Sequence, residues 1–284
     1  IPGSDLQGEA IILGAHYDAV SPVPALTPGA EQAASAAALL ALAREFAAHP
    51  PRRTVVLLWT AGHFQNMAGM RHFVPLLMAA AGRREAEVLD SALLRRLSGL
   101  ELRFFAGLDL SSQSPLLGAF RPRAPYRISL LAPPITAQLM NLVIAYEDSV
   151  LGGERVLVNG LKQDFARQGL GGMALTVPLD AAVVALAGCP ALAFATVNDS
   201  RARFDSPTDL PVGVRFDWLA RQVELLRQVL PGLANEPELA KWIWGKDAFG
   251  IIRGEVVHYG PRSYLPDQPT AGALVRVRLR QPTL

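Results

Sequence analysis

Apolar and polar residues form two kinds of pattern along this 284-residue chain. Short continuous apolar runs predict buried strands, and they cover 9–15, 53–61, 103–112 and 189–197. Longer stretches with apolar residues three and four apart predict helices at 29–48, 70–81, 84–97, 135–151, 179–188 and 217–230. Because the strands alternate with helices, the pattern indicates an α/β fold with a central, mostly parallel (mixed) sheet sandwiched by helices.

The pattern changes near residue 247, where period-two runs and Pro-rich turns predict β structure. We therefore predict an α/β domain over 1–246 and a short β extension over 247–284. The extension has too few residues to form a stable domain alone. Its segments "GIIRGEVV" and "PTAGALVRVRL" resemble the start of a carboxypeptidase-regulatory-like β domain.

Composition excludes several classes of function. The formal net charge is only +2, and the short Arg clusters lack the interleaved aromatic residues of a nucleic-acid-binding surface, so we predict no nucleic-acid partner. The single cysteine, Cys189, cannot form an internal disulfide. It lies in an apolar run, which predicts a buried, inert thiol rather than a nucleophile.

The longest strongly apolar stretch, 33–43, has about half of the roughly twenty residues that a membrane span needs, so we predict no membrane insertion by this segment. The sequence opens without Met or a signal peptide, which suggests a piece of a longer chain. If it is such a piece, we expect an extracytoplasmic or membrane-tethered location, with the tether in parts of the chain that are not present here.

Polar residues gather where the predicted strands end. The first strand ends in "GAHYDAV", with His16 and Asp18, and the third in "GLDL", with Asp109. Asp205 and Asp209 follow the fourth strand in "DSPTD". The carboxyl ends of parallel strands meet at one edge of a sheet, where α/β proteins place their ligands. An imidazole with a nearby carboxylate is a common metal arrangement, because the carboxylate holds the second ring nitrogen.

These motifs, in this order over about residues 1–232, resemble the zinc aminopeptidases of metallopeptidase family twenty-eight. That family includes bacterial leucyl aminopeptidases, glutamate carboxypeptidase and glutaminyl cyclase. The resemblance implies a zinc-aminopeptidase-like fold and a site for two zinc ions. "AHYD" matches the His-x-Asp motif at the end of the first strand, with His16 as a metal ligand. Asp109 in "GLDL" matches the Asp ligand at the end of the third strand.

Two other site positions depart from the family's pattern. The family's "PGADDxAS" supplies an Asp that bridges the two zinc ions, but this chain has "PGAEQAAS", with Gln32 at the lost bridging position and Glu31 beside it. A neutral amide cannot replace the anionic bridge that holds two dications together. The family's Glu-Glu pair, general base then ligand, is replaced by Gly62 and His63. Gly62 has no side chain that could accept a proton.

The remaining motifs are altered as well. Asp205 stands at the position of the last His ligand, Asp209 is retained, and "SDHxxF" is reduced to "LDAAVV", which keeps only Asp180. If the surviving groups converge, two His and two Asp could hold one zinc ion. The candidate ligands of that single site are His16, His63, Asp109 and Asp205, with Asp18, Asp209, Glu31 and Asp180 in supporting positions.

Three interpretations follow. In the first, the chain is a catalytically inactive peptidase-like domain that needs no cofactor and serves as a binding or scaffolding module for a protein or peptide partner. In the second, it is a one-metal zinc hydrolase or aminopeptidase with a rearranged ligand set and Glu31 as base. In the third, it is an ordinary two-zinc aminopeptidase whose motifs align differently.

Overall fold

A computed structural model describes residues 1–82, 91–120, 123–124, 127–128, 133–161, 179–237, 239, 256–261 and 266–272. The chain divides into two compact units, Ile1–Gly245 and Lys246–Leu284. The helix predicted over 84–97 and the extension predicted over 247–284 lie partly outside the described residues.

The first unit contains a six-stranded sheet in the order β2-β1-β3-β8-β4-β7. Its strands are β1 (Leu6–His16), β2 (Arg53–Thr60), β3 (Glu101–Asp109), β4 (Leu117–Phe120), β7 (Leu157–Gly160) and β8 (Ala191–Thr196). Neighbouring strands run parallel except β4 and β8, which pair antiparallel. This mixed, mostly parallel sheet confirms the predicted fold class. The apolar runs do not predict β4 and β7, which are only four residues long.

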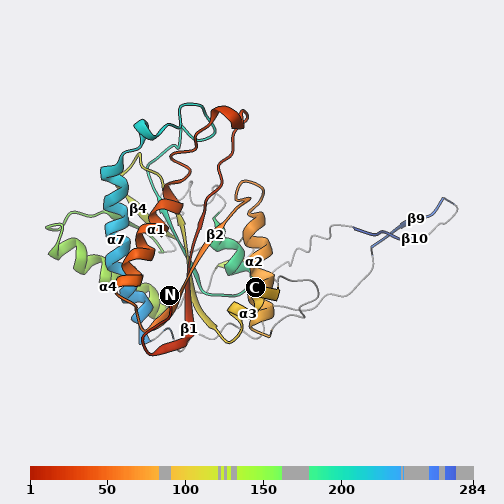
Figure 1. The fold of residues 1–284 in the computed structure, drawn as a ribbon, viewed down its shortest axis with the longest axis horizontal. Helices are drawn as coiled ribbons and strands as arrows, with labels where there is room; N and C mark the ends of the chain where they lie inside the picture. The colour runs from red at the N-terminus through yellow and green to blue at the C-terminus, as the bar shows by residue number, and fades with distance from the viewer. Residues whose placement is uncertain are drawn as a thin grey trace, which may run out of the picture. The chain divides into compact units, whose positions relative to one another are not determined.

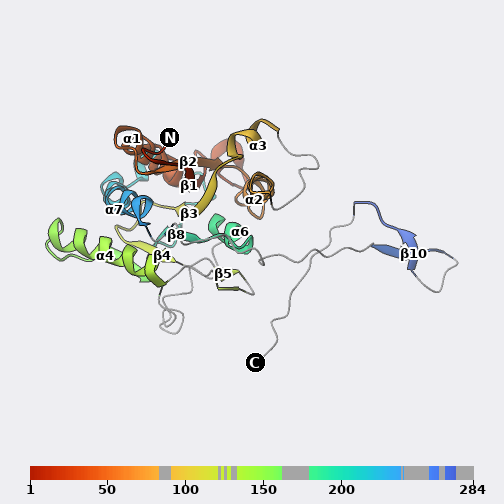
Figure 2. The ribbon, with the colours of Figure 1, turned by 90° about the horizontal axis from the view of Figure 1, so that it is seen from below.

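Helices cover both faces of the sheet. Figures 1 and 2 show α1 (Ala34–Ala48), α4 (Pro133–Ser149) and α7 (Phe216–Asn235) on one side, and α2 (Ala68–Ala80), α3 (Ser91–Leu97) and α6 (Asp180–Leu186) on the other. Short 3-10 helices η1 (Pro24–Leu26) and η3 (Pro211–Gly213) lie in loops after β1 and β8, and two-residue strands β5 (Arg123–Ala124) and β6 (Arg127–Ile128) pair with each other. The layers are those of a helix–sheet–helix sandwich.

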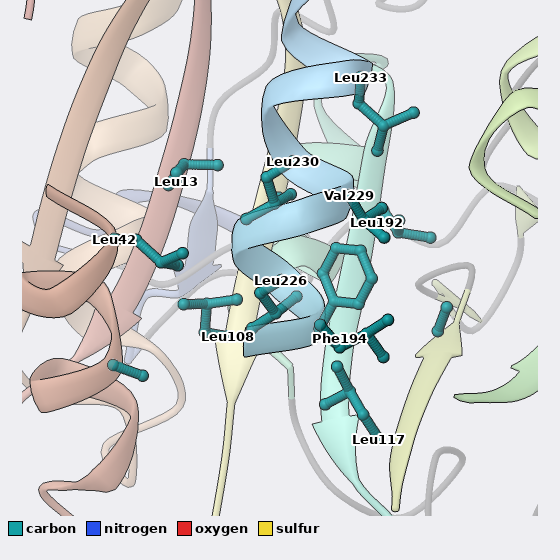
Figure 3. Packing of buried hydrophobic residues seen from close by; sticks show 14 of the residues in the cluster. Leu13, Leu42, Leu108, Leu117, Leu192, Phe194, Leu226, Val229, Leu230 and Leu233 are labelled. Atoms are coloured by element: carbon teal, nitrogen blue, oxygen red, sulfur yellow. The ribbon is translucent and has the colours of Figure 1, made fainter. Parts of the chain in front are cut away.

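The helices on each face of the sheet pack against it and bury a separate hydrophobic core. Figure 3 shows Leu226 and Leu230 of α7 packed toward the sheet, near Leu108 and Phe194. On the opposite face, the second core cluster contains Ile12, Phe105 and apolar residues of α2 and α6. Burial of these side chains is the main favourable contribution to folding, and it leaves the strand ends as the place for polar groups.

One charged residue is buried where β1, β2 and α7 meet. Arg53, at the start of β2, has no solvent exposure. Its Nε donates to Glu9 Oε2 at 2.7 Å, and its Nη1 donates to the carbonyls of Ala234 at 3.0 Å and Glu236 at 2.8 Å. Glu9 also accepts a bond from Arg103 at 3.0 Å. The guanidinium thus satisfies carbonyls at the end of α7 that have no partner within the helix.

In the second unit, β9 (Val257–Tyr259) and β10 (Pro266–Pro269) pair antiparallel.

Among the described residues of the whole chain, no helix has the length and apolar character to span a membrane.

Candidate functional site at the carboxyl edge of the sheet

Strand ends bring polar side chains together on one face of the sheet. His16 is the last residue of β1, and Asp109 is the last residue of β3. Because side chains alternate along a strand, His16 shares a face with Ile12, and Asp109 shares a face with Phe105. Ile12 and Phe105 belong to the core cluster that contains α6 residues. His16 and Asp109 therefore face the side on which α6 begins with Asp180.

The two histidines of the site form a buried stack. The rings of His16 and His63 lie with centroids 4.0 Å apart and planes inclined by 20°. The ring of Phe64 meets both edge-on, at 5.6 Å from His16 and 5.1 Å from His63. Both histidines are almost fully buried, and His16 Nε2 has no hydrogen-bond partner. The stack encloses one unused imidazole nitrogen.

Acidic residues hold His63 in this position. Its Nδ1 donates to Asp180 Oδ1 at 2.9 Å, and its backbone N–H donates to Asp18 Oδ2 at 3.0 Å. Thr60 Oγ1 donates to the other oxygen of Asp180 at 3.1 Å. Both oxygens of Asp180 are therefore engaged, and the orientation of the His63 ring is determined by α6 and β2.

The two histidines differ in proton affinity. Burial lowers the pKa of His16, and the neighbouring His63 lowers it further, against the opposing charges of Asp109, Asp180 and Asp18. Burial also lowers the pKa of His63, but the hydrogen bond and charge of Asp180, with the charges of Asp109 and Asp18, outweigh it and leave that pKa raised. A proton taken up by the stack therefore resides on His63, while His16 stays neutral.

Asp109 is paired with an arginine from the loop after β8. Arg201 Nη1 lies 2.5 Å from Asp109 Oδ1, and Nη2 donates to the Asp109 carbonyl at 3.0 Å. Both side chains are largely buried. Asp109 Oδ2 has no hydrogen-bond partner. The carboxylate is thus neutralised from one side by a cation of the chain itself.

Both the oxygen and the nitrogen of the Gln32 side-chain amide form hydrogen bonds with the loop after β1. Its Oε1 accepts from the Val20 N–H at 2.8 Å, and its Nε2 donates to the Val20 carbonyl at 3.2 Å. Its solvent exposure is 1%. A carboxylate could not make this pair, because it has no donor for the carbonyl. The side chain at the bridging position therefore fastens a loop.

We expect Gln32→Glu to lower the free energy of unfolding by about 2–3 kcal/mol. The substitution places a carboxylate oxygen against the Val20 carbonyl and buries a charge. Gln32→Met removes both bonds without adding a charge and should cost less, about 1 kcal/mol. Urea denaturation of the three proteins measures the difference; equal stability of Gln32→Glu and wild type would contradict the geometry.

Glu31 joins three loops. Its Oε2 accepts from Ser112 N at 2.8 Å, and its Oε1 accepts from Ser112 Oγ at 2.5 Å and from Gln113 Nε2. Its own N–H donates to Asp209 Oδ1 at 2.7 Å. These contacts hold the turns before α1, which begins at Ala34 rather than at the predicted residue 29. Glu31 is engaged in structural bonds at both oxygens, and Asp209 supports it.

Gly62 and Asp205 lie in unusual backbone conformations. Gly62 has φ +71°, and a Cβ there would lie 2.9 Å from the Cβ of Ala68. A side chain at the base position would therefore require the loop to move. Asp205 has φ +64° and is exposed, and its carbonyl accepts a bond from Ser21 Oγ at 3.3 Å.

Comparisons with known proteins give this arrangement a family context. Residues 1–85 match the model of peptidase family M28, and no curated protein sequence matches the chain. A zinc aminopeptidase from Bacillus subtilis is similar over 81% of this chain and 48% of its own, with 13% identity and a TM-score of 0.52. A glutaminyl cyclase from Fimbriiglobus ruber is similar over 79% and 71%, with 15% identity and a TM-score of 0.51. The γ-secretase component nicastrin is similar over 82% and 41%, with 12% identity and a TM-score of 0.53.

The chain has the M28 peptidase fold. This confirms the family resemblance that the motifs indicated. The chain spans about half the length of the Bacillus subtilis aminopeptidase, at 48% of that chain.

The residues of this M28-like domain do not fit a co-catalytic pair of zinc ions. Two zinc ions about 3.5–4 Å apart need an anionic bridge. Gln32 is neutral and hydrogen-bonded to the backbone of Val20, and Asp109 already forms an ion pair with Arg201. Three of the features that a two-metal site requires are thus changed: the bridge, one free carboxylate ligand and, at Gly62, the base.

A single ion has a different candidate set from the predicted one. Among the described residues, His16, His63 and Asp180 form the group whose donor atoms all lie within 4.8 Å of one another. Asp109 and Asp205, which the resemblance placed with the histidines, are not in this group. The bond between His63 and Asp180 uses His63 Nδ1, so His63 could offer an ion only its second ring nitrogen, Nε2, while Asp180 holds the ring. The nearly parallel rings also direct their nitrogen lone pairs along parallel planes rather than toward one point.

Arg201 is the site residue that the sequence interpretation missed. It lies in "NDSRARF", shortly after β8, at the same edge of the sheet as His16 and Asp109. Its place after a strand end is the only signal in the sequence, and an isolated Arg in a polar loop does not distinguish a surface residue from a buried partner.

Proposed function

We propose that this chain is a catalytically inactive M28-like domain that serves as a binding or scaffolding module of a larger protein. The observation that carries the proposal is the pair of hydrogen bonds between the Gln32 side-chain amide and the backbone of Val20. The position that must bridge two metal ions in the family mechanism instead secures the loop after β1.

Two further contacts support an inactive domain. At the base position, Gly62 has a left-handed backbone, and a side chain there would lie too close to Ala68 unless the loop moved. At the third-strand ligand position, Asp109 is paired with Arg201. The bridging, base and third-strand ligand positions are thus occupied by structural contacts or by bare backbone, and this supports an inactive domain.

The loops around the site offer a surface for a partner. Four large apolar side chains on or beside these loops are at least half exposed: Tyr17, Leu26, Val212 and Phe216, the first residue of α7. Single exposed apolar residues are ordinary on protein surfaces, but several on neighbouring loops are typical of contact sites. Bonds from Ser21 to the Asp205 carbonyl and from Ala30 to the Asp209 carbonyl join two of these loops. We therefore expect a protein or peptide partner to contact this edge of the domain.

Metal content and activity test the inactive interpretation together. After dialysis against zinc and then against buffer, we expect close to zero zinc equivalents per chain and no turnover of aminoacyl-nitroanilides. The opposite result, turnover that a chelator abolishes and that His16→Ala removes, would contradict the proposal. His72→Ala is the matched control, because His72 is an exposed histidine on α2 away from the described cluster.

A one-metal hydrolase is the alternative, and the unpaired His16 Nε2 within the His16, His63 and Asp180 group favours it. That alternative predicts one zinc equivalent, lost in Asp180→Asn. A two-metal aminopeptidase would give two equivalents.

A further inference from the structure

We propose that Arg201 is the resident cation of this site and takes the place of a metal ion in neutralising Asp109. This inference goes beyond the proposed binding role, because it concerns how the buried charges are balanced whether or not a partner binds. It starts from the disagreement between the donor groups present and the zinc pair that the family resemblance implies.

The loop after β8 is built to deliver the guanidinium to Asp109. Asp199 Oδ1 accepts from the Arg201 N–H at 2.7 Å, and Asp199 Oδ2 accepts from Ser111 Oγ at 2.5 Å. Asp199 and Ser111 are buried. Ser111 follows the end of β3 closely, so Asp199 ties the loop to the segment that carries Asp109.

The backbone of Arg201 adopts a conformation that an arginine rarely takes. Its φ is +53°, in the left-handed region. Residues other than Gly that adopt this region are held there by their surroundings, and such strain concentrates at sites with a role. The guanidinium also lies 5.2 Å from the ring centroid of Phe204. Backbone, carboxylate and ring contacts together hold the cation in one place.

Charge balance explains why this arrangement excludes a metal ion. A buried carboxylate needs a compensating charge, and Arg stays protonated at all ordinary pH values. A zinc ion beside Asp109 would meet the fixed positive charge of Arg201. Two potential donor atoms nevertheless have no partner, Asp109 Oδ2 and His16 Nε2. Removal of the guanidinium would therefore leave the Asp109 carboxylate uncompensated, at the same edge of the sheet as the unpartnered imidazole nitrogen of His16. Carboxylate and imidazole are ligand types that zinc accepts.

The test compares wild type with Arg201→Met, Asp109→Asn and the double variant, each by thermal unfolding with zinc chloride or EDTA and by zinc titration calorimetry. We expect Arg201→Met to unfold about 6–12 °C below wild type in EDTA. We also expect this variant to bind zinc at least tenfold more tightly than wild type and to recover part of the lost melting temperature. The double variant should recover stability without zinc and should show no zinc response.

A purely structural ion pair would produce the loss of stability but not the gain of zinc binding. Equal zinc affinity of wild type and Arg201→Met would overturn the proposal, and so would a melting temperature unchanged by Arg201→Met. If Arg201→Met does not fold, Arg201→Lys keeps the charge but loses the two-point contact, and it should lie between wild type and Asp109→Asn in melting temperature without a zinc response. Aminopeptidase turnover in wild type would contradict the proposed inactive function, whereas these zinc and stability readings report on Arg201 separately.

Discussion

Replacement of Arg53 by methionine is expected to lower the free energy of unfolding by about 3–5 kcal/mol. Arg53 is fully buried, and its guanidinium donates to Glu9 and to two carbonyls near the end of α7, Ala234 and Glu236. Methionine fills a similar volume but donates no hydrogen bond, so the Ala234 carbonyl stays buried without a partner. Guanidinium chloride denaturation measures the loss.

The neighbouring residue provides a matched control. Arg52 also forms an ion pair, with Asp5 at 2.8 Å, but about half of each side chain is exposed. Water already screens that pair, so Arg52→Met should change stability by less than about 1 kcal/mol. A loss of similar size in both variants would show that burial is not what gives Arg53 its effect.

The difference in the free energy of unfolding between wild type and Arg53→Met should also depend on pH. Burial raises the pKa of Glu9, but the bonds and charges of Arg103 and Arg53 outweigh it and lower that pKa from its ordinary value of 4.5. A carboxyl group whose folded-state pKa is lowered contributes stability above its unfolded-state pKa and loses it as the pH falls through the folded-state value. The stability gap should therefore be largest near neutral pH and should narrow below pH 4.5.

Replacement of Glu31 by alanine is the second large effect, with an expected loss of about 3–5 kcal/mol. The Glu31 carboxylate accepts bonds from the backbone and hydroxyl of Ser112 and from Gln113. Alanine would leave the Ser112 N–H without a partner in a site closed to water. It would also release the Ser112 hydroxyl that accepts from the Arg215 N–H at 2.8 Å, just before α7. Chemical denaturation with the same denaturant allows direct comparison with Arg53→Met.

Two variants separate the contribution of the Glu31 carboxylate from a general effect of mutation. Glu31→Gln keeps one acceptor oxygen in place and should lose about half as much stability as Glu31→Ala. Gln113→Ala removes one donor that is partly exposed and should cost about 1 kcal/mol. Wild-type stability in Glu31→Ala would mean that these bonds do not form in solution.

Much of the fold could be predicted from local pattern, and the errors have local causes. The apolar runs at 9–15, 53–61, 103–112 and 189–197 became β1, β2, β3 and β8, because fully buried parallel strands are continuously apolar. β4 and β7 were too short for such a run to stand out. The helix predicted to end at residue 230 continues through Pro231 to Asn235, because Leu233 and Ala234 remain buried against the core.

The candidate site could be predicted only in part. The strand ends placed His16, His63 and Asp109 at one edge, because parallel strands finish on the same side. The partners of these residues come from elsewhere in the chain: Asp180 begins a helix more than a hundred residues after His63, and Arg201 lies in the loop after β8. No local pattern marks such partners, since a lone Asp or Arg in a polar segment is usually solvated.

The sequence by itself determined the α/β class and the strands that carry the site, because these depend on local periodicity. Its resemblance to the M28 motifs further implied that Gln32 and Gly62 stand where that family has carboxylates. Only the tertiary structure decided that Gln32 fastens Val20, that His63 bonds to Asp180, and that Arg201 balances Asp109. Those pairings depend on which side chains folding brings within hydrogen-bond distance, and that distance is a property of the packed chain rather than of any segment.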